Sequence, residues 1–210
     1  MNIEVRKKGE ETSWDDLTNL LHEAFQERLD QGLHFSCSYL TPEDFERVSA
    51  KAVVLVAIDK DKNRLIGTSS VVIHESAEGK WAYFQNTAVH PDYKHQGVGS
   101  KLEEYRTEVA RENGCQYVLG DTATRAKSSI NFRKKYGFRI VGLKSWPATN
   151  YYSYVFRKQL VPDSKWSNPL YCKFQFWKSA IRCRMYHLAN GQDRKSKWLD
   201  LYKKLRGIPS

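Results

Sequence analysis

The sequence contains few cysteines and no long hydrophobic run. Its four cysteines, Cys37, Cys115, Cys172 and Cys183, are scattered, and none has the CxxC spacing of zinc and redox sites. We therefore expect no metal site and no disulfide framework, which suits a reducing compartment. No apolar stretch approaches the roughly 18 residues of a membrane-spanning helix, and the opening residues, MNIEVRKKGE, lack the apolar segment of a secretion signal. These absences predict a cytoplasmic protein.

Negative charge is scarce toward the C-terminus. Residues 1–156 contain 21 Lys and Arg and 21 Asp and Glu, whereas residues 157–210 contain 13 Lys and Arg against three Asp. The whole net charge of +10 therefore comes from the second segment. This change in composition predicts a core domain over residues 1–160 and a basic extension over residues 161–210.

A glycine-spaced loop is the most informative pattern in the chain. A short apolar strand ending at Val89 leads into a loop with Gly97 and Gly99, and a long helix is expected over residues 101–112. The first turn of a helix presents unpaired N–H groups and the positive end of the helix dipole. Glycines allow the close backbone approach that a phosphate requires. Strand, loop and helix together favour a phosphate site, with an ordinary two-glycine loop as the alternative.

Two well-known glycine loops do not match this one. The dinucleotide fingerprint needs a third glycine where Leu102 stands, and the P-loop pattern GxxxxGK followed by Ser or Thr is missing from the sequence. The loop instead resembles the acetyl-CoA loop of the GNAT superfamily of N-acetyltransferases. That pattern is Arg or Gln, two residues, Gly, one residue, then Gly or Ala, and here it reads Lys94-His-Gln-Gly97-Val-Gly99. Lys94 is a departure that keeps the positive charge of Arg but loses its planar fork.

A second segment, SINFRKKYGF over residues 129–138, resembles another GNAT motif, the helix A-x-x-F-Y-x-x-x-G-F. Ser129 stands at the Ala position and Phe132 at the Phe position. Arg133 replaces the Tyr that usually protonates the departing sulfur in this family. The two motifs cover about residues 50–157, and their pairing turns a generic anion site into a coenzyme A site.

The resemblance implies an α/β fold of the GNAT type, with a mixed, mostly antiparallel sheet flanked by helices. Hydrophobic periodicity and turn residues predict elements in a compatible order. The expected strands lie at residues 2–7, 52–58, 65–73, 81–89, 117–119, 138–143 and 151–157. The expected helices lie at residues 14–30, in a short segment that Thr41 caps, and at residues 101–112 and 127–136.

The resemblance also implies that acetyl-CoA is the cosubstrate and that no metal takes part. The backbone of the loop would bind the pyrophosphate, and the preceding strand would pair with the pantetheine arm. The cofactor-binding residues implied in this way are Thr87, Ala88, Val89, Lys94, His95, Gln96, Gly97, Val98, Gly99, Ser100, Ser129, Phe132 and Arg133.

Acetyl transfer to an amine needs an uncharged amine and a stabilised oxyanion. The resemblance implies a backbone N–H near Val89 as the oxyanion donor. An amine of pKa about 10.4 also needs a base. Asp121 is the first candidate, and its alternative role is to cap the next segment. Glu75 is a weaker candidate, because a charged strand residue is more often a surface residue.

Three further features leave alternatives open. Tyr136 lies three residues after Arg133 on a similar helix face, so it is either a substitute proton donor or a core residue. Arg133 itself has three readings: a contact to coenzyme A phosphate, a contact to an anionic substrate, or a solvated cation. The aromatic run over residues 145–154 either binds a ring of the acceptor or forms a well-packed hairpin.

The expected function is that of a bacterial, cytoplasmic N-acetyltransferase that moves the acetyl group of acetyl-CoA to a primary amine by direct attack. The acceptor would be a small molecule or a peptide.

The basic extension reads as two amphipathic helices, with apolar residues recurring over residues 170–188 and 198–205. Packing on the core or a homodimer contact is one interpretation. Contact with an anionic membrane or with RNA through residues 165–206 is another. The latter favours an alternative function, a membrane- or RNA-associated module on a GNAT core that is either non-catalytic or dependent on aminoacyl-tRNA.

Overall fold

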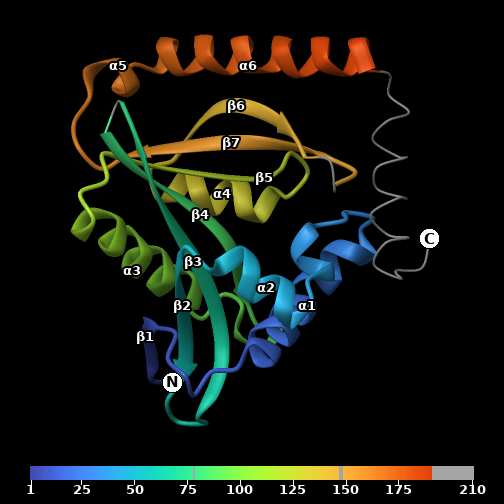
Figure 1. The fold of residues 1–210 in the computed structure, drawn as a ribbon, viewed down its shortest axis with the longest axis vertical. Coiled ribbons are helices and arrows are strands. Elements are labelled where there is room, and N and C mark those ends of the chain that lie inside the picture. The colour runs from blue at the N-terminus through green and yellow to red at the C-terminus, as the bar shows by residue number, and fades with distance from the viewer. Residues whose placement is uncertain (78, 147–148, 191–210) are drawn as a thin grey trace. The chain divides into compact units, whose positions relative to one another are not determined.

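The structure, a computed structural model, describes residues 1–77, 79–146 and 149–190. Seven strands form one sheet in the order β1-β2-β3-β4-β5-β7-β6 (Figure 1). Helices occur before, between and after the strands, so the expected mixed α/β fold with helices around a sheet is confirmed. The chain divides into two compact units, residues 1–27 with 37–118 and residues 28–36 with 119–210.

The strands of the first unit pair antiparallel in chain order. β1 pairs with β2, β2 with β3, and β3 with β4. Their bounds are β1 Ile3–Lys7, β2 Ala52–Asp59, β3 Arg64–Ser76 and β4 Gly79–Val89. Between the pairs Thr68–Ala88 and Ser70–Gln85 the register shifts, because β4 contains one more residue than β3 there. Asn86 lies in this bulge with a left-handed φ of 49°.

Side-chain caps begin the first two helices of this unit. The hydroxyl of Ser13 accepts a hydrogen bond from the Asp16 N–H at 3.0 Å at the start of α1, Trp14–Asp30. The expected Thr41 cap at the start of α2, Pro42–Ser49, is confirmed. The capping box joins Thr41 and Asp44 reciprocally, which satisfies N–H groups that the helix itself cannot.

The third helix of the unit, α3, packs closely on β3. It spans Val98–Glu112, and Val98 and Leu102 are completely buried. Gly67 on β3 allows this approach, because a Cβ there would lie 2.9 Å from Val98 Cγ1 and 3.0 Å from Leu102 Cδ1. The helix begins three residues earlier than the sequence predicted, at Val98 rather than at Lys101. The helix cannot begin before Val98, because the left-handed φ of 86° at Gly97 is not helical.

The second unit contains the last three strands and the C-terminal helices. β6 and β7 pair antiparallel. The bounds are β5 Tyr117–Ala123, which enters this unit at Leu119, α4 Lys127–Lys135, β6 Arg139–Ser145, β7 Tyr152–Gln159, α5 Ser164–Ser167 and α6 Pro169–Asn190. β5 continues past the predicted end at Leu119, and the short α5 has no counterpart among the predicted elements.

The long helix α6 runs beside β6 (Figure 1). The Ser179 hydroxyl accepts a hydrogen bond from the Leu143 N–H at 3.0 Å and donates one to the Leu143 carbonyl at 2.8 Å. Gly142 leaves room for this contact, since a Cβ there would lie 3.0 Å from Ser179 Oγ. The predicted helix over residues 170–188 is therefore confirmed as a helix, whereas the one predicted over residues 198–205 lies outside the described residues.

Candidate functional site

The loop between β4 and α3 ends in a helix N-terminus without a side-chain cap. β4 ends at Val89, a short 3-10 turn η2 follows at Pro91–Tyr93, and Gly97 is the N-cap of α3. A Cβ at Gly97 would meet no atom within 4 Å, so space adjoins the first turn of the helix. The helix N-terminus attracts negative charge through its dipole and its unpaired N–H groups. These features fit the pyrophosphate of coenzyme A.

Side chains of the loop brace its backbone. The Lys94 ammonium lies 2.6 Å from the Glu27 carboxylate on α1, and the Gln96 side-chain amide donates a 2.6 Å hydrogen bond to the Asp92 carbonyl. His95 takes a left-handed φ of 63°. The positive charge that replaces the family's Arg or Gln is thus held in an ion pair within this unit. The helix N-terminus, rather than Lys94, carries the fit to phosphate.

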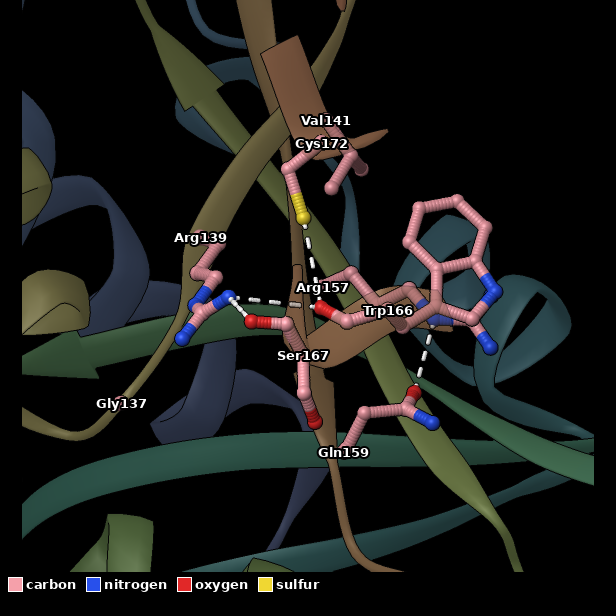
Figure 2. A pocket seen from close by; sticks show the side chains of 8 residues that line it. All are labelled: Gly137, Arg139, Val141, Arg157, Gln159, Trp166, Ser167 and Cys172. Carbon is pink, nitrogen blue, oxygen red and sulfur yellow. Dashed lines mark hydrogen bonds between the residues drawn. The ribbon is translucent and has the colours of Figure 1, made fainter. Parts of the chain in front are cut away.

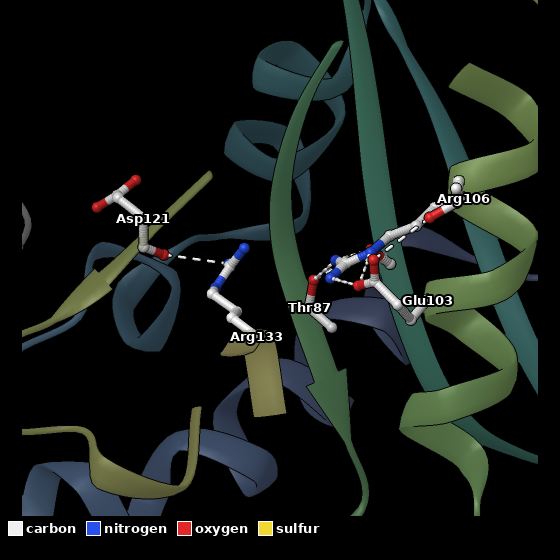
Figure 3. Close-up of polar contacts among 7 residues, drawn as sticks. Thr87, Glu103, Arg106, Asp121 and Arg133 are labelled. Atoms are coloured by element: carbon white, nitrogen blue, oxygen red, sulfur yellow. Dashed lines mark hydrogen bonds and ion pairs between the residues drawn. The ribbon is translucent and has the colours of Figure 1, made fainter. Parts of the chain in front are cut away.

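The strand before the loop contains the other predicted cofactor residues of this unit. Ala88 and Val89 pair with Thr68 and Gly67 on β3. The Thr87 hydroxyl accepts a 2.5 Å hydrogen bond from Arg106 Nη1, so this side chain is occupied by α3 (Figure 3). Thr87 would therefore contact a cofactor through its backbone.

Arg106 is a buried residue beside the candidate site that the sequence reasoning missed. It is 2% exposed and forms an ion pair with Glu103, which is 0% exposed, while its guanidinium also reaches Ser69 on β3 at 3.1 Å. It joins α3 to β3 and β4 beside the bulge, and so fixes the strand end relative to the loop. The i,i+3 spacing of Glu103 and Arg106 was the available signal, but the same spacing is common in pairs on helix surfaces.

In the second unit, Asp121 belongs to a small polar cluster at β5. The Trp146 indole N–H donates to Asp121 Oδ2 at 2.9 Å. The Lys144 ammonium lies 3.3 Å from the centre of the Trp146 ring. Loss of water around Lys144 lowers its pKa, and the negative charge of Asp121 opposes that shift. The cluster thus combines a carboxylate, an amine with a lowered pKa and an aromatic face.

The alternative of a capping Asp121 is wrong. β5 continues through Thr122 to Ala123, and α4 has Ala126 as its N-cap, so Asp121 lies within a strand and begins no helix. Trp146, which the sequence placed in an aromatic run of open purpose, is the residue that orients its carboxylate.

Arg133 is buried within the second unit, at 7% exposure. Its Nη2 donates a 3.2 Å hydrogen bond to the backbone carbonyl of Asp121 (Figure 3), and its guanidinium lies 5.6 Å from the ring centres of Phe138 and Phe156. The interpretation of Arg133 as a solvated cation is therefore wrong. Arg133 instead holds the backbone of Asp121, the candidate base itself.

The other predicted residues of α4 lie half-buried on the same helix. The rings of Phe132 and Tyr136 are 4.8 Å apart, and Tyr136 is the residue that ends the helix. Ser129 is half-buried in the first turn. The structure thus brings Asp121 and Arg133 together in one unit, and Phe132 and Tyr136 together on one helix.

The Acetyltransferase (GNAT) family matches residues 14–138, which is more than half of the chain. The chain belongs to the GNAT family. It is an acyltransferase, and acetyl-CoA is its cosubstrate. No curated protein matches the sequence.

Solved GNAT structures share the fold at low sequence identity. A GCN5-related N-acetyltransferase from Kribbella flavida has a TM-score of 0.61 and 17% identity, covering 75% of this chain and 98% of its own. A GNAT acetyltransferase from Elizabethkingia anophelis with acetyl-CoA bound has a TM-score of 0.55 and 18% identity, and the match covers 76% of this chain and 99% of the other. The NatC complex bound to Gag peptide and CoA has a TM-score of 0.59 and 14% identity, and the match covers 77% of this chain and 100% of the other.

Glu75 of this GNAT protein lies far along β3 from the loop. It pairs with Lys80 near the β3–β4 turn, whereas Gly67 on the same strand pairs with Val89 at the loop. Eight residues of strand separate Glu75 from Gly67, which corresponds to about 26 Å at ~3.3 Å per residue. Glu75 is also exposed, so we leave it out of the proposed chemistry.

A cavity of about 150 Å³ occurs elsewhere in the second unit (Figure 2). Two of its arginines are engaged by the protein: Arg139 donates to the Ser167 carbonyl, and the Arg157 guanidinium lies 4.0 Å from the centre of the Trp166 ring. None of the predicted site residues lines this cavity. It is therefore not the site that the GNAT motifs indicate.

Within residues 1–77, 79–146 and 149–190, no group of three or more His, Cys, Asp or Glu is arranged to hold a metal ion. Across the same residues, every helix is too short or too polar to cross a membrane.

Proposed function

We propose that the protein transfers the acetyl group of acetyl-CoA to a primary amine by direct attack, with the coenzyme A pyrophosphate bound at residues 94–100. One observation carries the proposal. Gly97 begins α3 in a left-handed conformation, with open space where a side chain would stand. An anion can therefore approach the unpaired N–H groups of the first helical turn.

The chemistry needs few groups beyond this. The amine lone pair attacks the thioester carbonyl, a backbone N–H near Val89 stabilises the resulting oxyanion, and the C–S bond then breaks. One oxyanion donor contributes roughly 3 kcal/mol to the transition state. Coenzyme A leaves tolerably as a thiolate, because a thiol has a pKa of about 8.5. The loss of the family's Tyr at Arg133 is compatible with activity for this reason, and Tyr136 is the proposed alternative donor.

Asp121 is the proposed base that takes the proton of the incoming ammonium. Its carboxylate is fixed from the side chain by Trp146 and from the backbone by Arg133, which suits a group that must meet the acceptor in one orientation. The negative charge of the carboxylate also attracts a cationic amine before transfer.

The acceptor is proposed to be an amine of a small molecule or of a peptide. The peptide in the NatC complex supports the second choice in a structural relative. A bacterial source and a cytoplasmic location stay predictions.

Two matched glycine substitutions test the coenzyme A site. Gly97→Glu places a carboxylate where the pyrophosphate should bind, and coenzyme A affinity by calorimetry should fall at least a hundredfold. Gly114→Glu is the control, because Gly114 has a similar φ of 72° and equally open surroundings but lies after the C-terminus of the same helix. Both variants bear a similar backbone strain. Unchanged affinity in Gly97→Glu, or equal losses in the two variants, would contradict the site.

An amine panel tests the transfer itself. Acetyl-CoA is incubated with amino sugars, polyamines and short peptides, and release of the free thiol is measured. Asp121→Asn should lower kcat by at least a hundredfold while coenzyme A affinity stays unchanged. Full activity of Asp121→Asn would remove it as the base without affecting the assignment of the loop.

A further inference from the structure

The helix α6 packs on the sheet of its unit through one narrow face. Cys172 is 5% exposed, the ring of Phe176 lies 6.1 Å from that of Tyr154 on β7, and Ser179 bonds to Leu143 on β6. At about 100° per residue these side chains point within one side of the helix. This side contains Cys172, Phe176 and Ser179 rather than a continuous row of large apolar residues.

The opposite side of α6 carries a stripe of large apolar side chains, each more than half exposed. Leu170 is 72% exposed, Trp177 64% and Ile181 56%. The stripe consists of Leu170, Phe174, Trp177, Ile181 and Met185. These positions fall within about 80° of helix surface, centred opposite the face that touches the sheet. The interpretation that these residues pack on the core is wrong within the described part of the chain.

Basic residues border the stripe on both sides. By helical position, Lys173 and Arg184 lie along one border and Lys178 and Arg182 along the other, and all four are exposed. The helix sequence from Pro169 to Asn190 contains neither Asp nor Glu. An apolar stripe between two rows of cations matches a helix that lies in the plane of a membrane interface.

We infer that α6 docks the protein on an anionic lipid surface, with the stripe inserted among the acyl chains and the four cations on the headgroups. Charge favours this occupant over a second copy of the chain. A two-fold contact through α6 would place its cations against identical cations, with no carboxylate on the helix to pair them. The aliphatic members of the stripe favour lipid over nucleic acid, because Leu170, Ile181 and Met185 offer a base no aromatic face.

Vesicle binding by the full chain tests the inference. Sedimentation is measured with phosphatidylcholine vesicles and with vesicles in which about a third of the lipid is phosphatidylglycerol. We expect binding to the anionic vesicles only, weakened by salt. Trp177→Ser with Ile181→Ser should weaken binding about a hundredfold, since each buried apolar side chain accounts for roughly tenfold. Lys178→Glu with Arg182→Glu should weaken it and flatten the salt dependence.

A matched control uses apolar residues that are exposed elsewhere. Val48 is 45% exposed on α2 and Val161 is 52% exposed before α5, and Val48→Ser with Val161→Ser should bind vesicles as the wild type does. Coenzyme A binding, measured in every variant, shows that the fold is intact and is independent of the lipid result.

Four outcomes would overturn the inference. They are no vesicle binding by the wild type, equal binding to neutral and anionic vesicles, equal losses in the stripe and control variants, and a wild-type dimer in light scattering that the stripe variant converts to a monomer. Salt-dependent binding to a single-stranded RNA without vesicle binding would likewise overturn it and favour nucleic acid.

Discussion

At the scale of single residues, a buried arginine in each unit holds a strand that contains residues of the proposed site. Arg106 ties the end of β4 to α3 through Thr87, and Arg133 donates to the Asp121 carbonyl on β5. A buried guanidinium must satisfy several donors at once, so its partners are held in a fixed geometry. Neither arginine needs to touch substrate for its loss to alter the site.

The ion pair of Arg106 and Glu103 should be costly to break from one side. Arg106→Met leaves the Glu103 carboxylate buried without its cation and should lower the free energy of unfolding by about 3–5 kcal/mol. Arg111→Met is the control, because Arg111 pairs with Glu108 at the same i,i+3 spacing on the same helix but is exposed. That change should cost less than about 1 kcal/mol. Urea unfolding measures both.

A double variant separates pairing from packing. Arg106→Met with Glu103→Leu should recover part of the stability lost in Arg106→Met, since no unpaired charge then stays buried. A double variant less stable than Arg106→Met would show that packing and the bonds to Thr87 and Ser69 dominate instead.

The sequence indicates residues that need an unusual backbone conformation, but it does not indicate residues whose importance depends on burial. Gly97 could be identified because only glycine readily takes its left-handed conformation at a helix start. Arg106 could not, because a Glu–Arg pair at helical spacing looks the same on a surface as in a core. The bond from Trp146 to Asp121 joins residues 25 positions apart, and no local pattern specifies it.

At the scale of elements, prediction succeeded where a local signal was strong. Thr41 followed by Pro42 predicted the start of α2, and β-branched runs predicted the strands. The start of α3 was placed three residues late, because glycine at position 99 reads as loop although it lies inside the helix. The predicted strand at β5 ends too early, before Gly120, because glycine has a low strand preference. Pairing in the sheet overrides that preference.

Gly67 should be intolerant of even one methyl group. Gly67→Ala puts a Cβ 2.9 Å from Val98 and 3.0 Å from Leu102, both completely buried, so α3 must shift away from β3. We expect a loss of about 1–3 kcal/mol in unfolding free energy. Coenzyme A affinity should fall as well, because Val98 is the first residue of the helix that forms the site. Thermal and urea unfolding with calorimetry measure both effects.

The double variant Gly67→Ala with Val98→Ala provides the check. Removing the Val98 methyl groups makes room for the new Cβ, so the two losses should be less than additive. Strict additivity would contradict a contact between these two positions.

At the scale of the whole molecule, the motifs that indicate the fold and the family lie in one part of the sequence, and the net charge lies in another. The residues that resemble GNAT enzymes lie before residue 160, and the net charge of +10 lies after residue 156. The apolar pattern of α6 was visible in the sequence. The sequence did not show whether this apolar face packs on the sheet or is exposed, because helical spacing reveals a face without revealing what covers it.

Coenzyme A should stabilise the whole fold by mass action. At a hundred times its dissociation constant, a ligand adds about 2.7 kcal/mol of stability. For a chain of this size that corresponds to a Tm increase of roughly 5–10 °C. Gly97→Glu should abolish the increase and Gly114→Glu should keep it. An equal increase with inorganic pyrophosphate in place of coenzyme A would show that the site recognises phosphate alone.

The hydrogen bonds between Ser179 and Leu143 protect the edge strand of the sheet. β6 is the last strand in the order, so one side of its backbone has no neighbouring strand among the described residues to satisfy its N–H and C=O groups. Such a strand can recruit a strand from another molecule and begin aggregation. Ser179 occupies both backbone groups of Leu143, and α6 shields this border. By covering this edge, α6 should hinder self-association of the sheet. Shortening the chain to residue 160 would expose the edge and also remove the proposed docking surface.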